Sequence, residues 1–296
     1  MLKSHGRYDY SPIVHRPDYD WPEGKRLAVF IALNIEHFIF GEGLGSDVAI
    51  PMPPPNHRSF AWRDYGNRVG VWRMLELFDE LGLPAAIQPN TELYDYAPEI
   101  MDAVRARGDE VVGHGRTNAE RQSDMSEDEE AAMLKEVYDT IAKHEGKPPG
   151  GWLGPWLAES YVTPDLLKET GYTYHLDWHC DDQPIWFRTR SGPILSVPYP
   201  MEVNDSPAIV FRRNTAADLA DMMIDGFDEM RRQSEKQPLV FGISLHTFVM
   251  GQSFRIPHLR RALEHITAHA GEVWFTHPGR IAEHAASLPP GTVPGS

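Results

Sequence analysis

The chain is poor in cysteine, in long apolar runs and in positive charge. Cys180 is the single cysteine among 296 residues, so a disulfide framework and a cysteine-rich zinc site are excluded. We find no apolar run of membrane-spanning length and no signal-peptide pattern, and therefore expect a cytoplasmic protein with no membrane partner. Lys and Arg number 28 against 43 Asp and Glu, a net charge of −15, so we also expect no nucleic-acid partner.

What the chain does contain is enough apolar material for a substantial core. Hydrophobic residues make up 41% and aromatic residues 10%, which excludes disorder for most of the chain. The sequence also holds 14 His and 8 Trp, a composition that suits an enzyme with a polar site lined by aromatic side chains.

Apolar strand-like runs alternate with amphipathic helical stretches along the chain. The first run, residues 27–35, is almost wholly apolar, and residues 71–81 show helical spacing up to Gly82, which suits a left-handed helix end. Ser126 and Glu129 form a capping box before another helix. Further strands are expected at 84–88, 110–113, 151–154, 173–176, 194–197, 239–245 and 273–276, and further helices at 92–107, 164–170 and 216–233.

This alternation predicts an α/β fold, a closed or nearly closed (β/α) barrel of about seven strands, with a doubly wound open sheet as the alternative. No long linker divides the chain, so we expect one domain over residues 1–296, with an extended N-terminal segment at 1–25 and a flexible tail at 285–296. The proline-rich stretch at 51–57 is expected to be a loop over a site or a subunit contact.

Polar residues stand where several apolar strands end, which is the edge that carries the active site in (β/α) barrels. Asn34 and Glu36 follow the first strand and alternate onto the same side. His114 lies between two glycines after the third strand, and His246 follows the strand at 239–245. A carboxylate and two imidazoles from three strand ends predict either a divalent metal site or a base, an oxyanion stabiliser and an acid for hydrolysis.

At these residues the sequence resembles the NodB-type polysaccharide deacetylase superfamily, in particular its divergent allantoinase and cyclic imide hydrolase-like branch. The resemblance covers residues 20–283 and rests on five short motifs in the right order. In the first, Asn34 and Glu36 stand at the two acidic positions. In the second, His114 is kept and Asn118 stands where the second metal-binding histidine falls. The other three motifs are Gly154-Pro155-Trp156, Asp181-Asp182-Gln183-Pro184-Ile185-Trp186 and Leu245-His246.

The resemblance implies a distorted (β/α) barrel of the NodB-homology type and a hydrolase acting on carbon–nitrogen bonds other than peptide bonds. The usual three-ligand zinc site lacks one acid and one histidine here, and asparagine is a poor metal ligand without charge. Glu36 is then free to act as general base, while His114 and His246 polarise the carbonyl or protonate the leaving nitrogen. Alternatively, Glu36, His114 and Glu120 bind one divalent metal ion such as Zn²⁺.

A small-molecule amide substrate needs a pocket around these catalytic candidates. We expect Trp156, Trp186 and Phe248 to supply apolar walls, and Arg116 or Arg255 to pair with a substrate carboxylate or carbonyl. The full set of residues expected to bind substrate is Asn34, His37, Arg116, Trp156, Asp182, Trp186 and Phe248. The resemblance also implies a homo-oligomer, either a dimer or a tetramer.

Three functions are compatible with these features. The first is hydrolysis of a small cyclic or linear amide, such as a ureide or an imide. The second is metal-dependent N-deacetylation of a polysaccharide or oligosaccharide. The third is a non-catalytic protein that binds carbohydrate or another small molecule, which the neutral side chains of Asn34 and Asn118 would suit. Retention of Glu36, His114 and His246 argues against the third.

Overall fold

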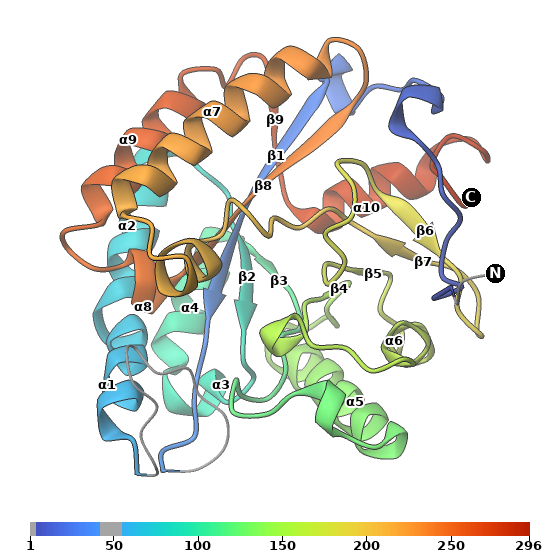
Figure 1. The fold of residues 1–296 in the computed structure, drawn as a ribbon. Coiled ribbons are helices and arrows are strands. Elements are labelled where there is room, and N and C mark those ends of the chain that lie inside the picture. The colour runs from blue at the N-terminus through green and yellow to red at the C-terminus, as the bar shows by residue number, and fades with distance from the viewer. Residues whose placement is uncertain (1–3, 42–54) are drawn as a thin grey trace.

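The strands form two sheets that meet at their edges (Figure 1). The computed structural model describes residues 4–41 and 55–296, so most of the loop expected at 51–57 lies outside the described residues. One sheet has the order β3-β2-β1-β8, with β9 also beside β1, and the other has the order β4-β5-β7-β6. The strands are β1 (Leu27–Ile35), β2 (Ala86–Pro89), β3 (Glu110–Val111), β4 (Gly151–Trp152), β5 (Tyr174–His175), β6 (Ile185–Phe187), β7 (Ile194–Ser196), β8 (Leu239–His246) and β9 (Trp274–Phe275).

Two parallel backbone bridges join the sheets into a distorted barrel. Gly113 pairs with Trp152, and Asn204 pairs with Ser244. With these bridges, β1, β2, β3, β4, β5, β7 and β8 follow one another around the barrel in parallel. This arrangement confirms the predicted (β/α) barrel and excludes the open sheet. The short strand β6 was not predicted and runs antiparallel to β7.

The first strand shows how the sequence separates the inside of the barrel from its outside. The odd-numbered residues from Leu27 to Leu33 pack in the cluster that lies under the helices. The even-numbered Ala28, Phe30 and Ala32 belong to a second cluster on the other face of the strand. Because side chains alternate along a strand, Asn34 and Glu36 continue the inward series at the carboxyl end of the barrel.

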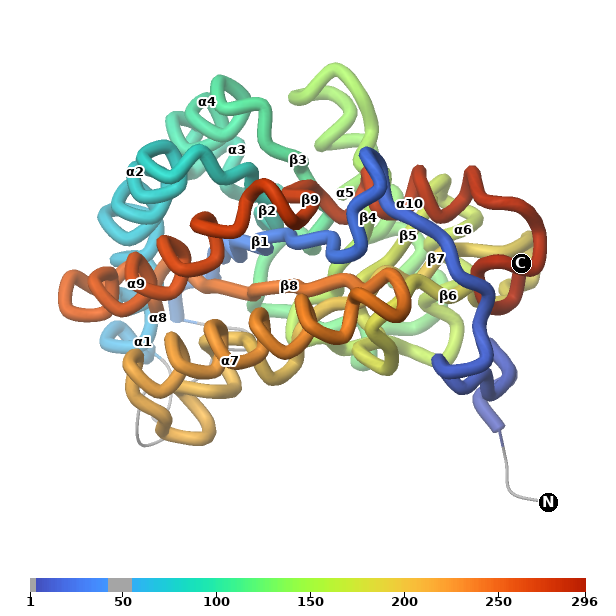
Figure 2. The backbone as a smooth tube through the Cα atoms, turned by 90° about the horizontal axis from the view of Figure 1, so that it is seen from above, coloured from blue at the N-terminus to red at the C-terminus, as the bar shows by residue number. Residues whose placement is uncertain are grey.

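Helices pack outside the strands, with α2 and α7 both against α9 (Figure 2). In the described ranges, we find no helix that combines the length and the apolar character needed to cross a membrane. The helices are α1 (His57–Tyr65), α2 (Val71–Leu81), α3 (Leu93–Tyr96), α4 (Pro98–Arg107), α5 (Glu127–Glu145), α6 (Thr163–Thr170), α7 (Ala216–Ser234), α8 (Thr247–Met250), α9 (Ile256–Thr267) and α10 (Pro278–Ser287).

Local signals placed several of these helices correctly. Helix α2 has the predicted bounds, and Gly82 ends it with a φ of 65°. The Ser126–Glu129 capping box begins α5 as predicted. The single helix expected at 92–107 is instead α3 followed by α4, because the chain turns at Ala97 and restarts with a proline in the first helical position.

Both chain ends pack beside β6, as Figure 1 shows. The described part of the N-terminal segment contains two short 3-10 turns, Ile13–His15 and Pro22–Gly24, and its Arg7 forms an ion pair with Asp165 at 2.8 Å. The prediction of a flexible tail at 285–296 is wrong. Residues 285–287 belong to α10, Val293 is 2% exposed, and the Trp186 amide donates to the carbonyl of residue 294 at 2.8 Å. The tail is fixed by this docking, which its proline and glycine content did not reveal.

Candidate active site

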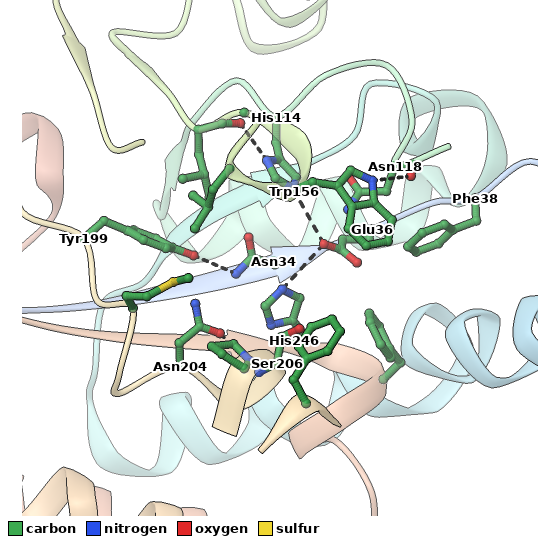
Figure 3. Close-up of a pocket in the computed structure, with 17 residues that line it drawn as sticks. Asn34, Glu36, Phe38, His114, Asn118, Trp156, Tyr199, Asn204, Ser206 and His246 are labelled. Atoms are coloured by element: carbon green, nitrogen blue, oxygen red, sulfur yellow. Dashed lines mark hydrogen bonds and ion pairs between the residues drawn. The ribbon is translucent and has the colours of Figure 1, made fainter. Parts of the chain in front are cut away.

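Strand register brings the predicted catalytic side chains together at the carboxyl end of the barrel. The pairing of β1 with β8 sets Asn34 beside His246, and His114 follows β3 two strands away. Figure 3 shows Glu36 between His114 and His246. All four side chains are buried and line one pocket.

Glu36 is held between two imidazoles. Its Oε1 lies 3.5 Å from Nε2 of His246 and 3.8 Å from Nε2 of His114. Burial alone raises the pKa of the Glu36 carboxyl, but His246, His114 and the buried Arg63 outweigh burial and hold this pKa below its ordinary value. Glu36 is therefore ionised at neutral pH and can accept a proton.

His246 is oriented by Asp205, a residue that sequence analysis missed. Asp205 Oδ1 lies 2.6 Å from His246 Nδ1, and its Oδ2 accepts the His246 backbone N–H at 2.8 Å. Burial disfavours the charged imidazole, but Asp205 and Glu36 together raise the pKa of His246 above its ordinary value. Protonated His246 thus presents an Nε2–H donor toward Glu36.

His114 is held through its Nδ1, and its Nε2 faces Glu36 in the pocket. Its Nδ1 lies 2.7 Å from the Leu153 carbonyl oxygen, which can only accept, so Nδ1 carries the hydrogen. Among the described residues its buried Nε2 has no hydrogen-bond partner. This nitrogen is therefore available to hold a water molecule or a substrate atom in the pocket.

Asn34 lines the pocket, as predicted, but its amide nitrogen is already engaged. It lies 3.2 Å from each of the Tyr199 hydroxyl, the Ser244 hydroxyl and the Leu245 carbonyl oxygen. Tyr199 and Ser244 are themselves 2.6 Å apart. Asn34 therefore ties β1 to Tyr199 on the far side of β8, and only its amide oxygen is left for a ligand.

Asn118 is part of the frame that positions the loop after His114. Its Oδ1 accepts from Asn90 Nδ2 at 3.0 Å, and its backbone N–H donates to the His37 carbonyl at 2.8 Å. Its own carbonyl accepts the Trp156 indole N–H at 2.9 Å. Asn118, which stands where the family has its second metal-binding histidine, thus forms hydrogen bonds within the protein.

These residues do not fit the zinc site that the resemblance implies. Asn34 and Asn118 are neutral, and the amide oxygen of Asn118 is engaged with a neighbouring amide. Glu36, His114 and His246 are not among the described groups of three that place one ligand atom each within 4.8 Å of one another. The groups available for chemistry in this pocket are its own acids and bases, Glu36, His114 and His246.

The prediction of Glu120 as a metal ligand, and of Arg116 as a substrate-binding residue, is wrong. Arg116 Nη2 lies 2.7 Å from Glu120 Oε2, and its Nη1 lies 3.0 Å from Glu136 Oε2, so the three form an ion-pair cluster outside the pocket. Gly115, with a φ of 70°, turns the chain after His114 and directs Arg116 away.

Three other residues predicted to bind substrate also lie outside the pocket. His37 faces the opposite side from Glu36 and packs against Tyr96, with ring centroids 4.3 Å apart and the rings tilted by 36°. Asp182 lies at the other end of the barrel, where its carbonyl accepts the Val240 N–H at the start of β8. Trp186 belongs to β6 and packs against the C-terminal tail.

The pocket has a cavity volume of about 160 Å³ and largely apolar walls. Trp156 and Phe248 line it as predicted, and Trp156 has a φ of 66°, which is uncommon for a bulky residue. Sequence analysis missed most other lining residues because they come from loops between strands. These are Phe38, Leu153, Leu157, Tyr199, Met201, Asn204, Ser206, Pro207 and Phe211.

The sequence is similar to known deacetylases. The family model for polysaccharide deacetylase matches residues 61–175. The peptidoglycan deacetylase of Helicobacter pylori is 25% identical over 245 residues, which cover 72% of this chain and 82% of that relative.

Similar folds are found among solved structures. The crystal structure of PuuE allantoinase has a TM-score of 0.82 and 26% identity, and covers 95% of this chain and 99% of its own. A Pseudomonas aeruginosa PAO1 protein assigned to the polysaccharide deacetylases has a TM-score of 0.79 and 26% identity, over 90% and 93% of the two chains. On this sequence and structural evidence, the chain is a hydrolase that acts on carbon–nitrogen bonds and is similar to the polysaccharide deacetylases.

Proposed function

We propose that the protein hydrolyses a carbon–nitrogen bond in a small cyclic amide, such as a ureide or an imide. The observation that carries this proposal is the position of Glu36, an ionised carboxylate between two imidazoles that do not converge on a metal. The similarity to PuuE allantoinase over almost the whole chain supports the same substrate class.

The first step is attack of water on the amide carbon. Glu36 holds the water by accepting one of its hydrogens, and Nε2 of His114, 3.8 Å from Glu36 Oε1, faces the same space. As the water oxygen bonds to the carbon, Glu36 takes the proton. The carbonyl oxygen gains negative charge, which the Nε2–H of protonated His246 stabilises.

The second step is collapse of the tetrahedral intermediate. The carbon–nitrogen bond breaks, and the nitrogen needs a proton to leave as a neutral amine or amide. His246 supplies that proton through Nε2, while Asp205 stabilises its charged form until transfer. Glu36 then returns its proton to His246, and a cyclic substrate leaves as one ring-opened product.

The size and the walls of the pocket suit a single planar ring. A volume of about 160 Å³ is close to that of engineered apolar cavities, roughly 150 Å³, that bind benzene. Trp156 and Phe248 offer aromatic surface, while Asn34, Asn204 and Ser206 offer polar groups. A second candidate is N-deacetylation of an oligosaccharide, which the similarity to the Helicobacter pylori enzyme favours.

The test is hydrolysis of allantoin, a simple cyclic imide and an N-acetylated chito-oligomer by the purified protein. We expect ring opening that is lost in Glu36→Gln and His246→Ala and kept in Arg116→Ala, since Arg116 lies outside the pocket. Circular dichroism of each variant controls for folding. Cleavage of the chito-oligomer alone would support the second candidate, and activity that survived in both Glu36→Gln and His246→Ala would contradict the mechanism.

A further inference from the structure

A buried group of acids and one histidine lies behind the wall of the active-site pocket. Glu159 follows the turn that carries Trp156, His175 ends β5, and Asp177 lies two residues further along. Each of the three offers one ligand atom within 4.8 Å of the other two. His175 is wholly buried and Asp177 is 5% exposed, while the Glu159 side chain is 12% exposed.

Each carboxylate in this group has one oxygen bound by a protein N–H, and the two side chains also interact with each other. Glu159 Oε2 accepts the Trp178 indole N–H at 2.6 Å, whereas its Oε1 has no hydrogen-bond partner among the described residues. Asp177 Oδ1 accepts the Gly154 N–H at 2.6 Å, whereas its Oδ2 has none within that range. The outer hydrogen bonds fix both carboxylates and leave their inner oxygens directed at one another.

The imidazole of His175 is the independent sign that a ligand belongs here. Within the described chain neither of its ring nitrogens has a hydrogen-bond partner, although buried polar groups are almost always paired. Its Nδ1 lies 3.8 Å from Glu159 Oε1, too far for a hydrogen bond. Two zinc ligands at bond lengths of roughly 2.0–2.2 Å are separated by roughly 3.3–3.6 Å, which is close to this distance.

The negative charges around His175 would also be stabilised by a cation. A third carboxylate, Glu130, is fully buried nearby and is hydrogen-bonded through Oε1 to Gln122 and Thr163. The charge of Arg7 acts on Glu159 and on His175, but Arg7 itself is paired with Asp165 at 2.8 Å. Several buried carboxylates without a paired cation are costly in a protein interior, so either protons or a metal ion must neutralise them.

We propose that Glu159, His175 and Asp177 bind a divalent transition-metal ion of the Zn²⁺ class. One imidazole and two carboxylates are ligands that suit such an ion, and the two carboxylate charges balance its own. The hydrogen bonds from Trp178 and from the Gly154 backbone would then orient the ligands from outside, as in known metal sites. This site is separate from Glu36 and does not depend on the function proposed above.

The ion would stabilise the wall of the active-site pocket. Asp177 links the site to Gly154, which lines the pocket together with Trp156. A Cβ at Gly154 would lie 2.6 Å from Gln122 Oε1 and 3.2 Å from Asp177 Oδ1, so this turn is tightly enclosed by the cluster. The ion would have a structural role, because none of its three ligands lines the active-site pocket.

Metal content of the wild-type protein is the first measurement. We expect about one equivalent of Zn²⁺ per chain by inductively coupled plasma mass spectrometry, when the protein is produced with added zinc and purified without chelator. X-ray absorption should show a shell of nitrogen and oxygen ligands at roughly 2.0–2.2 Å. One equivalent of Mn²⁺ or Fe²⁺ with such a shell would support the same site. A metal content near zero would overturn the proposal without affecting the one for Glu36.

Variants then locate the ion. Glu159→Gln, His175→Asn and Asp177→Asn should each lose the bound metal and lower Tm, whereas His114→Asn should keep one equivalent. If the two carboxylates share a proton instead, Glu159→Gln and Asp177→Asn would keep or raise Tm, because an amide replaces the protonated acid, and that result would overturn the proposal. Loss of metal in His114→Asn alone would also overturn it, by placing the ion in the active-site pocket.

Discussion

Asp205 holds His246 at two points, through the ring nitrogen Nδ1 and through the backbone N–H. The two contacts measure 2.6 and 2.8 Å and use both carboxylate oxygens of Asp205. The first fixes the tautomer and the charge of the imidazole, and the second fixes the end of β8 that carries it. Because the imidazole cannot turn away, its Nε2–H faces Glu36.

The wild-type enzyme should stay active to lower pH than an ordinary glutamate base allows and to higher pH than an ordinary histidine acid allows. On the acid side, activity should fall only as pH drops through the pKa of Glu36, which lies below its ordinary value. On the alkaline side, activity should fall as pH rises through the pKa of His246, which lies above its ordinary value. The measurement is the pH profile of kcat/KM. An alkaline limb at or below pH 6.5, the ordinary pKa of histidine, would contradict the assignment of His246 as the acid.

Asp205→Asn should move the alkaline limb of that profile to lower pH. The neutral amide removes the largest charge that favours protonated His246, so less of the imidazole carries its proton at neutral pH. A loss of general acid catalysis costs roughly 10²–10⁴-fold in kcat, and we expect a decrease in this range. A merely structural role for Asp205 would lower Tm without moving the limb, so Tm is measured alongside.

The same pKa shifts predict how stability depends on pH. His246 has a raised pKa in the folded protein, so its charge contributes stability that is complete below the unfolded pKa and is lost as pH rises through the folded value. Glu36 has a lowered pKa, so its contribution is present above its unfolded pKa and is lost as pH falls through the folded value. In Asp205→Asn the decline of Tm with rising pH should be smaller, and should end at lower pH, than in the wild type.

The residues that sequence analysis placed correctly are those that strand alternation determines. Alternation along the first strand puts Asn34 and Glu36 on one side, and the structure has both in the pocket. The same rule applied to His37 places it opposite Glu36, where the structure has it against Tyr96. The prediction that His37 binds substrate therefore rested on its being next to Glu36 in the sequence, and not on the direction of its side chain.

The residues that sequence analysis missed depend on contacts between distant segments. Asp205 lies 41 residues before His246, at the start of the π-helical turn Ser206–Phe211, and becomes its partner only because the preceding Asn204 pairs with Ser244 of β8. Arg116 shows the reverse error, because one glycine turn after His114 is enough to send it outward. Loops carry no repeating signal from which such directions could be predicted.

Trp156→Phe should weaken substrate binding more than catalysis. The substitution keeps an aromatic wall but removes the indole N–H that donates to the Asn118 carbonyl at 2.9 Å. A net hydrogen bond of roughly 0.5–1.5 kcal/mol predicts an increase in KM of roughly 2- to 10-fold, with kcat changed less. Trp72→Phe is the matched control, since Trp72 is similarly exposed but lies on α2 outside the pocket. Equal KM values for the two variants would contradict this role.

Asn34→Asp should destabilise the protein although the two side chains have the same shape. The aspartate has no N–H for the Tyr199 and Ser244 hydroxyls, and it sets a carboxylate oxygen against the Leu245 carbonyl. An unsatisfied buried group costs roughly 1–3 kcal/mol, or about 2–5 °C in Tm for a chain of this size. Asn214→Asp, half-exposed just before α7, should be nearly neutral. Equal Tm values for the two variants would show that the Asn34 hydrogen bonds contribute little.

The close packing of helix α8 against two glycines gives a further prediction. Helix α8 carries Phe248, which lines the pocket. Gly70 and Gly251 pack directly against each other and against the end of this helix. A Cβ at Gly70 would lie 2.1 Å from the Thr247 carbonyl oxygen, and a Cβ at Gly251 would lie 2.4 Å from the Gly70 Cα. Backbone atoms cannot rotate aside as a side chain can, so any larger residue must displace α8.

Gly70→Ala should therefore lower Tm and raise KM together. Overpacking of this kind costs roughly 1–3 kcal/mol, and the displaced α8 would shift Phe248 in the pocket wall. Gly271→Ala is the matched control, because a Cβ there meets nothing within 4 Å and its φ is not positive. Since Gly70 has a φ of −61°, alanine suits its backbone, and the effect must come from the close packing alone. Indistinguishable Tm values for the two variants would mean that α8 yields at little cost and does not fix the pocket wall.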